Sequence, residues 1–237
     1  MVARLRLYLL IFCLTGGVLT GLLCVPLFAA EGQALNRPAI SSKPMELFGT
    51  TEFRGSLKAL KSWQELAEKA RRQVAEFNAC DTSGSGCNAA ARSWQQMQLT
   101  AATLTPHEQL KWVNQFFNRW PYRLDLETYQ QLDYWATPKE FMQFSGDCED
   151  YSISKYFALR QLGYPAEQLR IVVLKDSIRN LGHAVLTISQ DNQIYVLDNL
   201  SDLILPQGRY SHYQPQYSVN EEYRWAHIRK FNRRVAK

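Results

Sequence analysis

The fold class is decided by GDCEDYSISKYFALRQLGYP, residues 146–165, where the last helix precedes a change to strands. Apolar residues recur at helical spacing from Ile153 to Leu162. Gly163 and Pro165 end this helix, and Cys148 lies in its first turn. The sequence therefore predicts a helix that begins at Cys148.

The residues after this helix have strand character. β-branched residues are concentrated in three runs, at 170–175, 183–189 and 194–198. Asp191-Asn192 separates the last two runs and is typical of a hairpin turn. A later run, 222–231, alternates aromatic and charged residues and predicts an edge strand.

Helices are expected before this stretch. Apolar spacing predicts helices from Ser56 to Ala79 and from Ala89 to Leu99. The runs Thr105-Pro106-His107-Glu108 and Thr137-Pro138-Lys139-Glu140 each combine an N-cap Thr, a first-turn Pro and a third-position Glu, so each starts a helix. The first of these two helices should stop before Pro121. Helices followed by an antiparallel sheet make this an α+β protein.

The composition is that of an ordinary globular protein. The chain has 237 residues, of which 46% are hydrophobic and 21% charged. This length allows one domain with a substantial core. The formal net charge of +5 is small, and Arg4 and Arg6 of the first segment carry part of it. Such weak and scattered charge does not indicate nucleic-acid binding.

The N-terminus has the pattern of a targeting segment, because two arginines precede a long uncharged apolar run. Residues 1–30 are therefore predicted to be either a cleaved signal peptide or an anchor held in the inner membrane by residues 7–28. Membrane contact is expected only through this segment. Residues 31–55 mix Pro and Gly with polar residues and predict a linker, which leaves 56–237 as the folded domain, outside the cytoplasm.

The cysteines agree with an oxidising compartment. Cys80 and Cys87 flank a Gly- and Ser-rich loop that can close a small disulfide, although two free thiols are the alternative. With that pair joined and two further cysteines in the apolar N-terminal run, Cys148 is the thiol left over. Burial or catalysis would explain an unpaired thiol in an exported protein.

Cys148 has a position suited to a nucleophile, because the first turn of a helix stabilises thiolate over thiol. His183 follows Gly182 at the opening of a strand and is the best-placed base among four histidines. Asp198 ends the partner strand of the hairpin, where it can orient the imidazole. Each residue alone also fits a structural role, but their combination favours a Cys–His–Asp triad.

Three acids adjoin this cysteine. Asp147, Glu149 and Asp150 suit a helix N-terminus, which is their structural explanation. Their charge should also disfavour a Cys148 thiolate. A hard cation would remove that conflict, and clustered oxygen ligands suit Ca²⁺.

Four motifs resemble the bacterial transglutaminase-like cysteine proteinases over roughly residues 45 to 230. The motifs are Asp133–Phe141, Gly146–Tyr151, Gly182–Val185 and Leu197–Asn199. This resemblance implies a papain/transglutaminase-like fold. It also implies that Cys148, His183 and Asp198 form the triad and that Asp147, Glu149 and Asp150 bind Ca²⁺.

The same resemblance implies a place and partners for the protein. Its substrate would be the N-terminal region of a large surface adhesin, cut at a di-alanine site in the periplasm to disperse biofilm. An inner-membrane receptor of LapD type, responding to cyclic-di-GMP, would sequester it. Trp135 is a candidate for that docking surface, or else a core residue. A transglutaminase or amidase, and a non-catalytic calcium-binding module, are the alternative functions.

Overall fold

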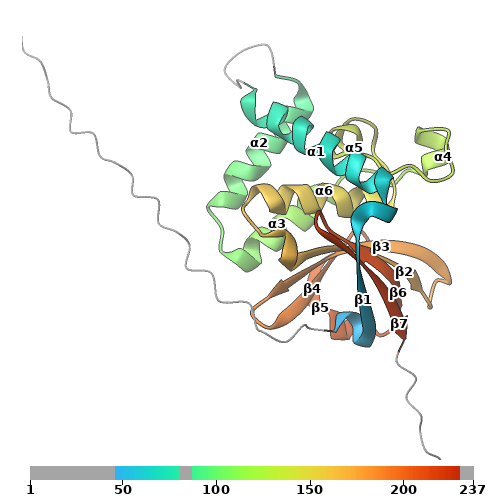
Figure 1. Cartoon of the computed structure of the whole chain (residues 1–237). Helices are drawn as coiled ribbons and strands as arrows, with labels where there is room; N and C mark the ends of the chain where they lie inside the picture. Colours follow the sequence, from blue (N-terminus) through green and yellow to red (C-terminus); the bar gives the residue numbers. More distant parts are fainter. Residues whose placement is uncertain (1–45, 81–86, 230–237) are drawn as a thin grey trace, which may run out of the picture. The chain divides into compact units, whose positions relative to one another are not determined.

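The structure, a computed structural model, describes residues 46–80 and 87–229 (Figure 1). Its α-helices are α1 (Lys61–Ala79), α2 (Ala89–Ala102), α3 (Pro106–Phe117), α4 (Asp125–Thr128), α5 (Pro138–Phe144) and α6 (Cys148–Gln161). Its strands are β1 (Thr50–Ser56), β2 (Leu169–Asp176), β3 (Leu181–Gln190), β4 (Gln193–Asp198), β5 (Ser201–Pro206), β6 (Tyr213–Val219) and β7 (Tyr223–Arg229). Its 3-10 helices are η1 (Leu47–Gly49), η2 (Leu57–Ala59), η3 (Ala166–Gln168) and η4 (Gln207–Arg209). The predicted α+β class is confirmed.

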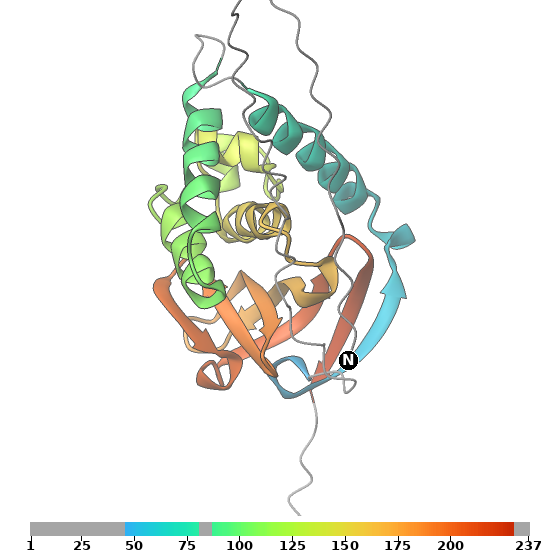
Figure 2. The same cartoon turned by 90° about the vertical axis from the view of Figure 1, so that its left-hand side faces the viewer.

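The strands of the described residues form one antiparallel sheet in the order β1-β7-β6-β2-β3-β4-β5. Helices α1, α2, α3, α5 and α6 lie together over one face of this sheet (Figures 1 and 2). The opposite face carries a smaller apolar cluster that includes Leu47 of η1. Because side chains alternate along a strand, Ile171 of β2 joins the helix-side core whereas Val172 and Leu174 join this second cluster.

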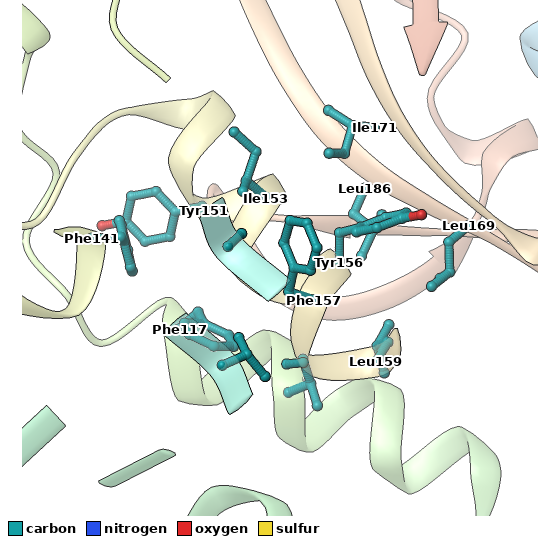
Figure 3. Close-up of a cluster of buried hydrophobic side chains, with 14 of the residues drawn as sticks. Phe117, Phe141, Tyr151, Ile153, Tyr156, Phe157, Leu159, Leu169, Ile171 and Leu186 are labelled. Carbon is teal, nitrogen blue, oxygen red and sulfur yellow. The ribbon is translucent and has the colours of Figure 1, made fainter. Parts of the chain in front are cut away.

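Helix α6 is the centre of the helical layer, since it packs on β2 and β3 and also on α3 and α5. Figure 3 shows two of its residues, Tyr156 and Phe157, in one apolar cluster with Phe117 of α3 and Leu186 of β3. Burial of apolar side chains of this size contributes roughly 1.5–3 kcal/mol each. This packing fixes the first residue of the helix, Cys148, against β3.

Both predicted helix starts are confirmed. The N–H of Thr105 donates to Oε2 of Glu108 at 3.0 Å, and the N–H of Thr137 donates to Oε2 of Glu140 at 2.9 Å. Both are the reciprocal bonds of a capping box. Helix α3 ends before Pro121, as predicted.

The three predicted β-branched strands correspond to β2, β3 and β4. Asp191-Asn192 forms the β3–β4 turn, with positive φ values of 51° and 59° that suit a tight hairpin. The sequence did not predict β5 or β6. Pro215 lies within β6, beside the shift in β2–β6 register between Val173 and Leu174. Its missing N–H therefore falls at an irregularity, where a strand tolerates proline.

The N-terminal part of the sheet differs from the sequence prediction. The end of the predicted linker, together with Ser56, forms β1 (Thr50–Ser56), which pairs along the whole length of β7. β7 therefore lies between β1 and β6, and the prediction of an edge strand at 222–231 is wrong. The helix predicted from Ser56 begins at Lys61, after a 3-10 turn.

The predicted targeting segment, residues 1–30, and residues 31–45 of the linker lie outside the described residues. Within the described part of the chain, no helix combines the length and the apolar character that crossing a membrane requires. The predicted disulfide between Cys80 and Cys87 is present, and Cys148 is the free cysteine of the described residues.

Candidate active site

Cys148 is the first residue of α6 and lies against β3, where it meets Ala184. Its side chain is buried, and the backbone N–H of Ala184 on β3 faces its sulfur. The N–H groups of the first helical turn have no intrahelical acceptor, so they also point toward this end of α6. The nucleophile candidate thus lies at a helix N-terminus, as the sequence predicted, and the structure adds that it faces β3.

His183 and Asp198 meet in a buried hydrogen bond. His183 Nε2 lies 2.9 Å from Asp198 Oδ1, and both side chains are almost fully enclosed. The N–H of Leu200 donates to the same oxygen at 3.0 Å, and the hydroxyl of Tyr213 donates to Oδ2 at 2.5 Å. Burial opposes ionisation of Asp198, but these hydrogen bonds outweigh it and lower the pKa of the carboxyl below its ordinary value.

The β3–β4 hairpin brings these two residues together diagonally. Its ladder begins at the pair Leu186 and Leu197. His183 lies three residues before that pair on β3, and Asp198 one residue after it on β4. Within the described residues no hydrogen bond joins Cys148 to His183. Because Nε2 is bound to Asp198, Nδ1 is the ring nitrogen left to act on the thiol.

Glu149 opposes ionisation of the cysteine. The Cys148 thiol donates to Glu149 Oε2 at 2.8 Å. Burial raises the pKa of the thiol, and the negative charges of Glu149 and Asp147 raise it further. The sequence-based conflict between a reactive cysteine and its acidic neighbours is therefore present in the structure.

The acids form a compact group that includes one residue the sequence did not single out. Carboxylate oxygens of Asp125, Asp147 and Asp150 lie within 4.8 Å of one another, and Asp147 and Glu149 form a second such group with Cys148. Burial and neighbouring carboxylates raise the pKa of Asp147 to about 9. Burial likewise raises the pKa of Asp150 to about 8.

Two oxygens of this group are buried without a hydrogen-bond partner in the described part of the chain, namely Oδ1 of Asp125 and Oδ1 of Asp147. Buried carboxylate oxygens without donors are costly unless a cation binds them. The donor set is all oxygen, which fits a hard cation such as Ca²⁺. Asp125, Asp147, Glu149 and Asp150 are thus the residues that could hold the ion.

Backbone contacts place Asp125 beside the cysteine segment. Tyr122 forms an isolated bridge with Gly146, and the N–H of Arg123 donates to the Gly146 carbonyl at 2.9 Å. The Asp150 carboxylate is also held by the backbone, since the N–H of Ala136 donates to its Oδ1 at 2.6 Å. No local pattern in the sequence marks Asp125, because its role depends on this long-range bridge.

These observations agree with a comparison of families, in which the family described as bacterial transglutaminase-like cysteine proteinase matches residues 67–233. The chain belongs to this family. Membership confirms the predicted papain/transglutaminase-like fold and supports a peptidase. Among curated proteins, no sequence matches the chain.

Solved structures similar to this transglutaminase-like cysteine proteinase include LapG of Legionella pneumophila. It is 29% identical, with a TM-score of 0.54, over 66% of this chain and 87% of LapG. The calcium-bound structure of that LapG has the same identity and TM-score over 71% of this chain and 92% of LapG. A calcium ion is therefore found in a protein similar to this cysteine proteinase.

Trp135, the predicted docking residue, is partly buried in this family member. Its ring packs edge-on against Trp63, with 5.9 Å between ring centroids. It immediately precedes Ala136, whose N–H binds Asp150. Trp135 is thus anchored in the core while retaining an exposed part, and its role in binding a partner stays a prediction.

Proposed function

We propose that the chain is a calcium-dependent cysteine endopeptidase in which Cys148 is the nucleophile, His183 the base and Asp198 the residue that orients the base. The observation that carries this proposal is the buried 2.9 Å contact of His183 with Asp198, one residue from the Ala184 N–H that faces the sulfur. Because His183 and Ala184 are consecutive, base and nucleophile are neighbours across the α6–β3 interface.

In the acylation step, Nδ1 of His183 takes the thiol proton of Cys148, and the sulfur attacks the carbonyl carbon of the scissile peptide bond. The carbonyl electron pair moves to oxygen, where N–H groups of the first α6 turn can stabilise the oxyanion. Collapse of this intermediate breaks the C–N bond, and His183 gives its proton to the leaving amine. The products are a new N-terminus and a Cys148 thioester.

In the deacylation step, His183 takes a proton from water while the water oxygen attacks the thioester carbon. The C–S bond then breaks, and the proton returns to the Cys148 sulfur. The second product is a free carboxylic acid. Throughout both steps Asp198 keeps Nε2 of His183 bound, so that Nδ1 always faces the sulfur.

The acidic group would be held by calcium in the active protein. The ion would be bound by four acids, Asp125, Asp147, Glu149 and Asp150, and would supply positive charge beside the nucleophile. With their charge neutralised, the carboxylates would no longer raise the pKa of the Cys148 thiol, and Glu149, bound to the ion, would no longer accept the hydrogen bond of that thiol. The fit of the oxygen set and the calcium-bound LapG support this part of the proposal.

For the biological role, we propose cleavage of the N-terminal region of a large surface adhesin in the periplasm. Control would come from an inner-membrane receptor of LapD type that responds to cyclic-di-GMP, with Trp135 on the docking surface. The similarity to LapG over most of its length supports this assignment.

The decisive experiment incubates the full protein with N-terminal adhesin fragments, with Ca²⁺ or with excess EGTA. We expect new N-termini with Ca²⁺ and none with EGTA. Cys148→Ala should abolish cleavage while retaining calcium-induced thermal stabilisation, which controls for its fold. Full cleavage in EGTA contradicts the calcium requirement.

The same experiment separates the alternatives. Isopeptide bonds in the presence of an amine, instead of new N-termini, identify a transglutaminase. An inert Cys148, which iodoacetamide fails to modify at any calcium concentration, identifies a non-catalytic calcium-binding module.

A further inference from the structure

The carboxylate of Asp198 has two oxygens with different partners. Oδ1 accepts from His183 at 2.9 Å and from the N–H of Leu200 at 3.0 Å. Oδ2 accepts from the hydroxyl of Tyr213 at 2.5 Å. A carboxylate held at both oxygens cannot rotate about its terminal bond without breaking a charge-assisted hydrogen bond.

Tyr213 is itself fixed in place. It opens β6, pairs with Asp176 of β2 and is only 5% exposed. Its ring meets the His183 ring edge-on, with 5.7 Å between centroids, and stacks on Tyr210 at 5.1 Å. One side chain therefore contacts both the acid and the base of the proposed triad, from a strand that carries neither.

We infer that Tyr213 is a positioning residue, whose hydroxyl fixes the Asp198 carboxylate so that Oδ1 holds the His183 ring in its working orientation. This inference rests on the proposed function, because it concerns the same site. Burial and the adjacent Asp198 charge raise the pKa of Tyr213, so the phenol stays protonated and donates throughout the neutral range.

Removal of this hydroxyl leaves Asp198 Oδ2 buried without a donor. Hydrogen bonds to charged groups contribute enough that Tyr213→Phe should lower kcat roughly 10- to 100-fold. KM should change less than about twofold, since Tyr213 touches no substrate in this scheme. The rate at which iodoacetamide alkylates Cys148 should fall by a factor similar to that of kcat.

A matched control lies next to it. Tyr210 is stacked on Tyr213, and its buried hydroxyl has no hydrogen-bond partner among the described residues. Tyr210→Phe removes the same group from the same aromatic cluster without freeing an oxygen of Asp198. It should leave kcat and the alkylation rate within about twofold of the unmodified protein.

The test is a double-mutant cycle with Asp198→Ala, read out by Cys148 alkylation and checked for folding by thermal midpoint. We expect Tyr213→Phe to slow alkylation in the original protein and to have no further effect when Asp198 is absent. An equal slowing in both backgrounds, or no difference from Tyr210→Phe, overturns the inference.

Failure of the proposed function gives a different result. In that case the unmodified protein shows no Cys148-dependent cleavage, and Asp198→Ala leaves the alkylation rate unchanged. The inference about Tyr213 fails alone when Asp198→Ala slows alkylation and Tyr213→Phe does not.

Discussion

Lys155 is a buried amine two turns along α6 from Cys148. Its side chain has no exposed surface, and Nζ lacks a hydrogen-bond partner in the described part of the chain. Its amine lies 5.7 Å from the Tyr151 ring centroid. Burial lowers the pKa of Lys155 to about 7, although Asp198 and Asp202 attract the charged form.

This low pKa makes the free energy of unfolding depend on pH. The unfolded chain binds the proton with a pKa near 10.5, so it holds more protons than the folded protein between pH 7 and 10.5. The free energy of unfolding therefore rises with pH between 7 and 10.5, and the destabilisation caused by buried Lys155 is largest at pH 7 and below. Lys155→Met should raise the unfolding free energy at pH 7 by roughly 2–4 kcal/mol.

Urea unfolding at pH 7 and pH 9.5 measures this effect. The gain from Lys155→Met should shrink at the higher pH. Lys58→Met, at an exposed position, serves as the control and should change stability by less than about 0.5 kcal/mol at either pH. A destabilised Lys155→Met protein at pH 7 contradicts the expectation.

Gly146 lies at a position with no room for a side chain. A Cβ built at this position lies 1.9 Å from Asp150 Oδ2. Gly146→Ala should therefore displace the Asp150 carboxylate, lower the unfolding free energy by about 1–3 kcal/mol and weaken calcium binding. Gly208→Ala is the matched control, because its Cβ would have no neighbour within 4 Å. Calorimetric titration with Ca²⁺ measures the calcium affinity, and thermal unfolding measures the stability. An unchanged calcium affinity in Gly146→Ala contradicts the prediction.

At the scale of elements, His227 joins three strands. The hydroxyl of Thr50 on β1 donates to the carbonyl of Leu47, so it accepts from Nδ1 of His227 at 2.9 Å. Nε2 then accepts from the hydroxyl of Ser218 on β6 at 2.8 Å. The neutral ring thus fastens β1 and β6 to β7, and burial lowers the pKa of His227 to about 4.

Stability should fall in acid through this group. The unfolded pKa is near 6.5, so the contribution is complete above pH 6.5 and is lost as pH falls toward 4. We expect about 1–2 kcal/mol of His227-dependent destabilisation between pH 7 and pH 4.5. Urea unfolding of His227→Gln should show a flatter pH profile over this window, whereas His107→Gln, at an exposed position, should keep the original profile. An unchanged profile in His227→Gln contradicts the expectation.

Elements differ in how well the sequence predicts them. Helices α3 and α5 begin with complete capping boxes, which are local signals. By contrast, β1 is recognisable only through its pairing with β7, more than 160 residues later in the chain. The sequence does not indicate β6 because Pro215 is unusual inside a strand and is tolerated here only beside the shift in β2–β6 register, where β6 carries an extra residue.

At the scale of the whole molecule, calcium should couple to folding. A ligand that binds only the folded state stabilises it in proportion to the logarithm of its concentration. Excess EGTA should therefore lower the thermal midpoint of unfolding. Asp125→Asn should reduce the difference between the midpoints measured with Ca²⁺ and with EGTA. Asp191→Asn, in the exposed β3–β4 turn, serves as the control and should leave this difference in midpoint unchanged. Equal midpoints with and without Ca²⁺ in the unmodified protein contradict this coupling.

The sequence predicted the residues of the candidate site that carry local signals and missed those that depend on the fold. Cys148 follows a helix-start acid, and His183 and Asp198 flank a recognisable hairpin. Asp125 reaches the acidic group through the Tyr122–Gly146 bridge, and no local pattern encodes that bridge. Tyr213 likewise reaches Asp198 from β6, a strand the sequence did not predict.

Because the candidate site spans the boundary between α6 and β3, its activity should depend on how closely these two elements pack. The proposed nucleophile belongs to the helical layer, whereas the proposed base and acid belong to the sheet. A loosening of α6 from β3 by a fraction of a side-chain diameter would separate thiol from imidazole while both layers kept their secondary structure. Mild heat or denaturant should therefore silence the enzyme reversibly before circular dichroism registers any loss of helix or strand.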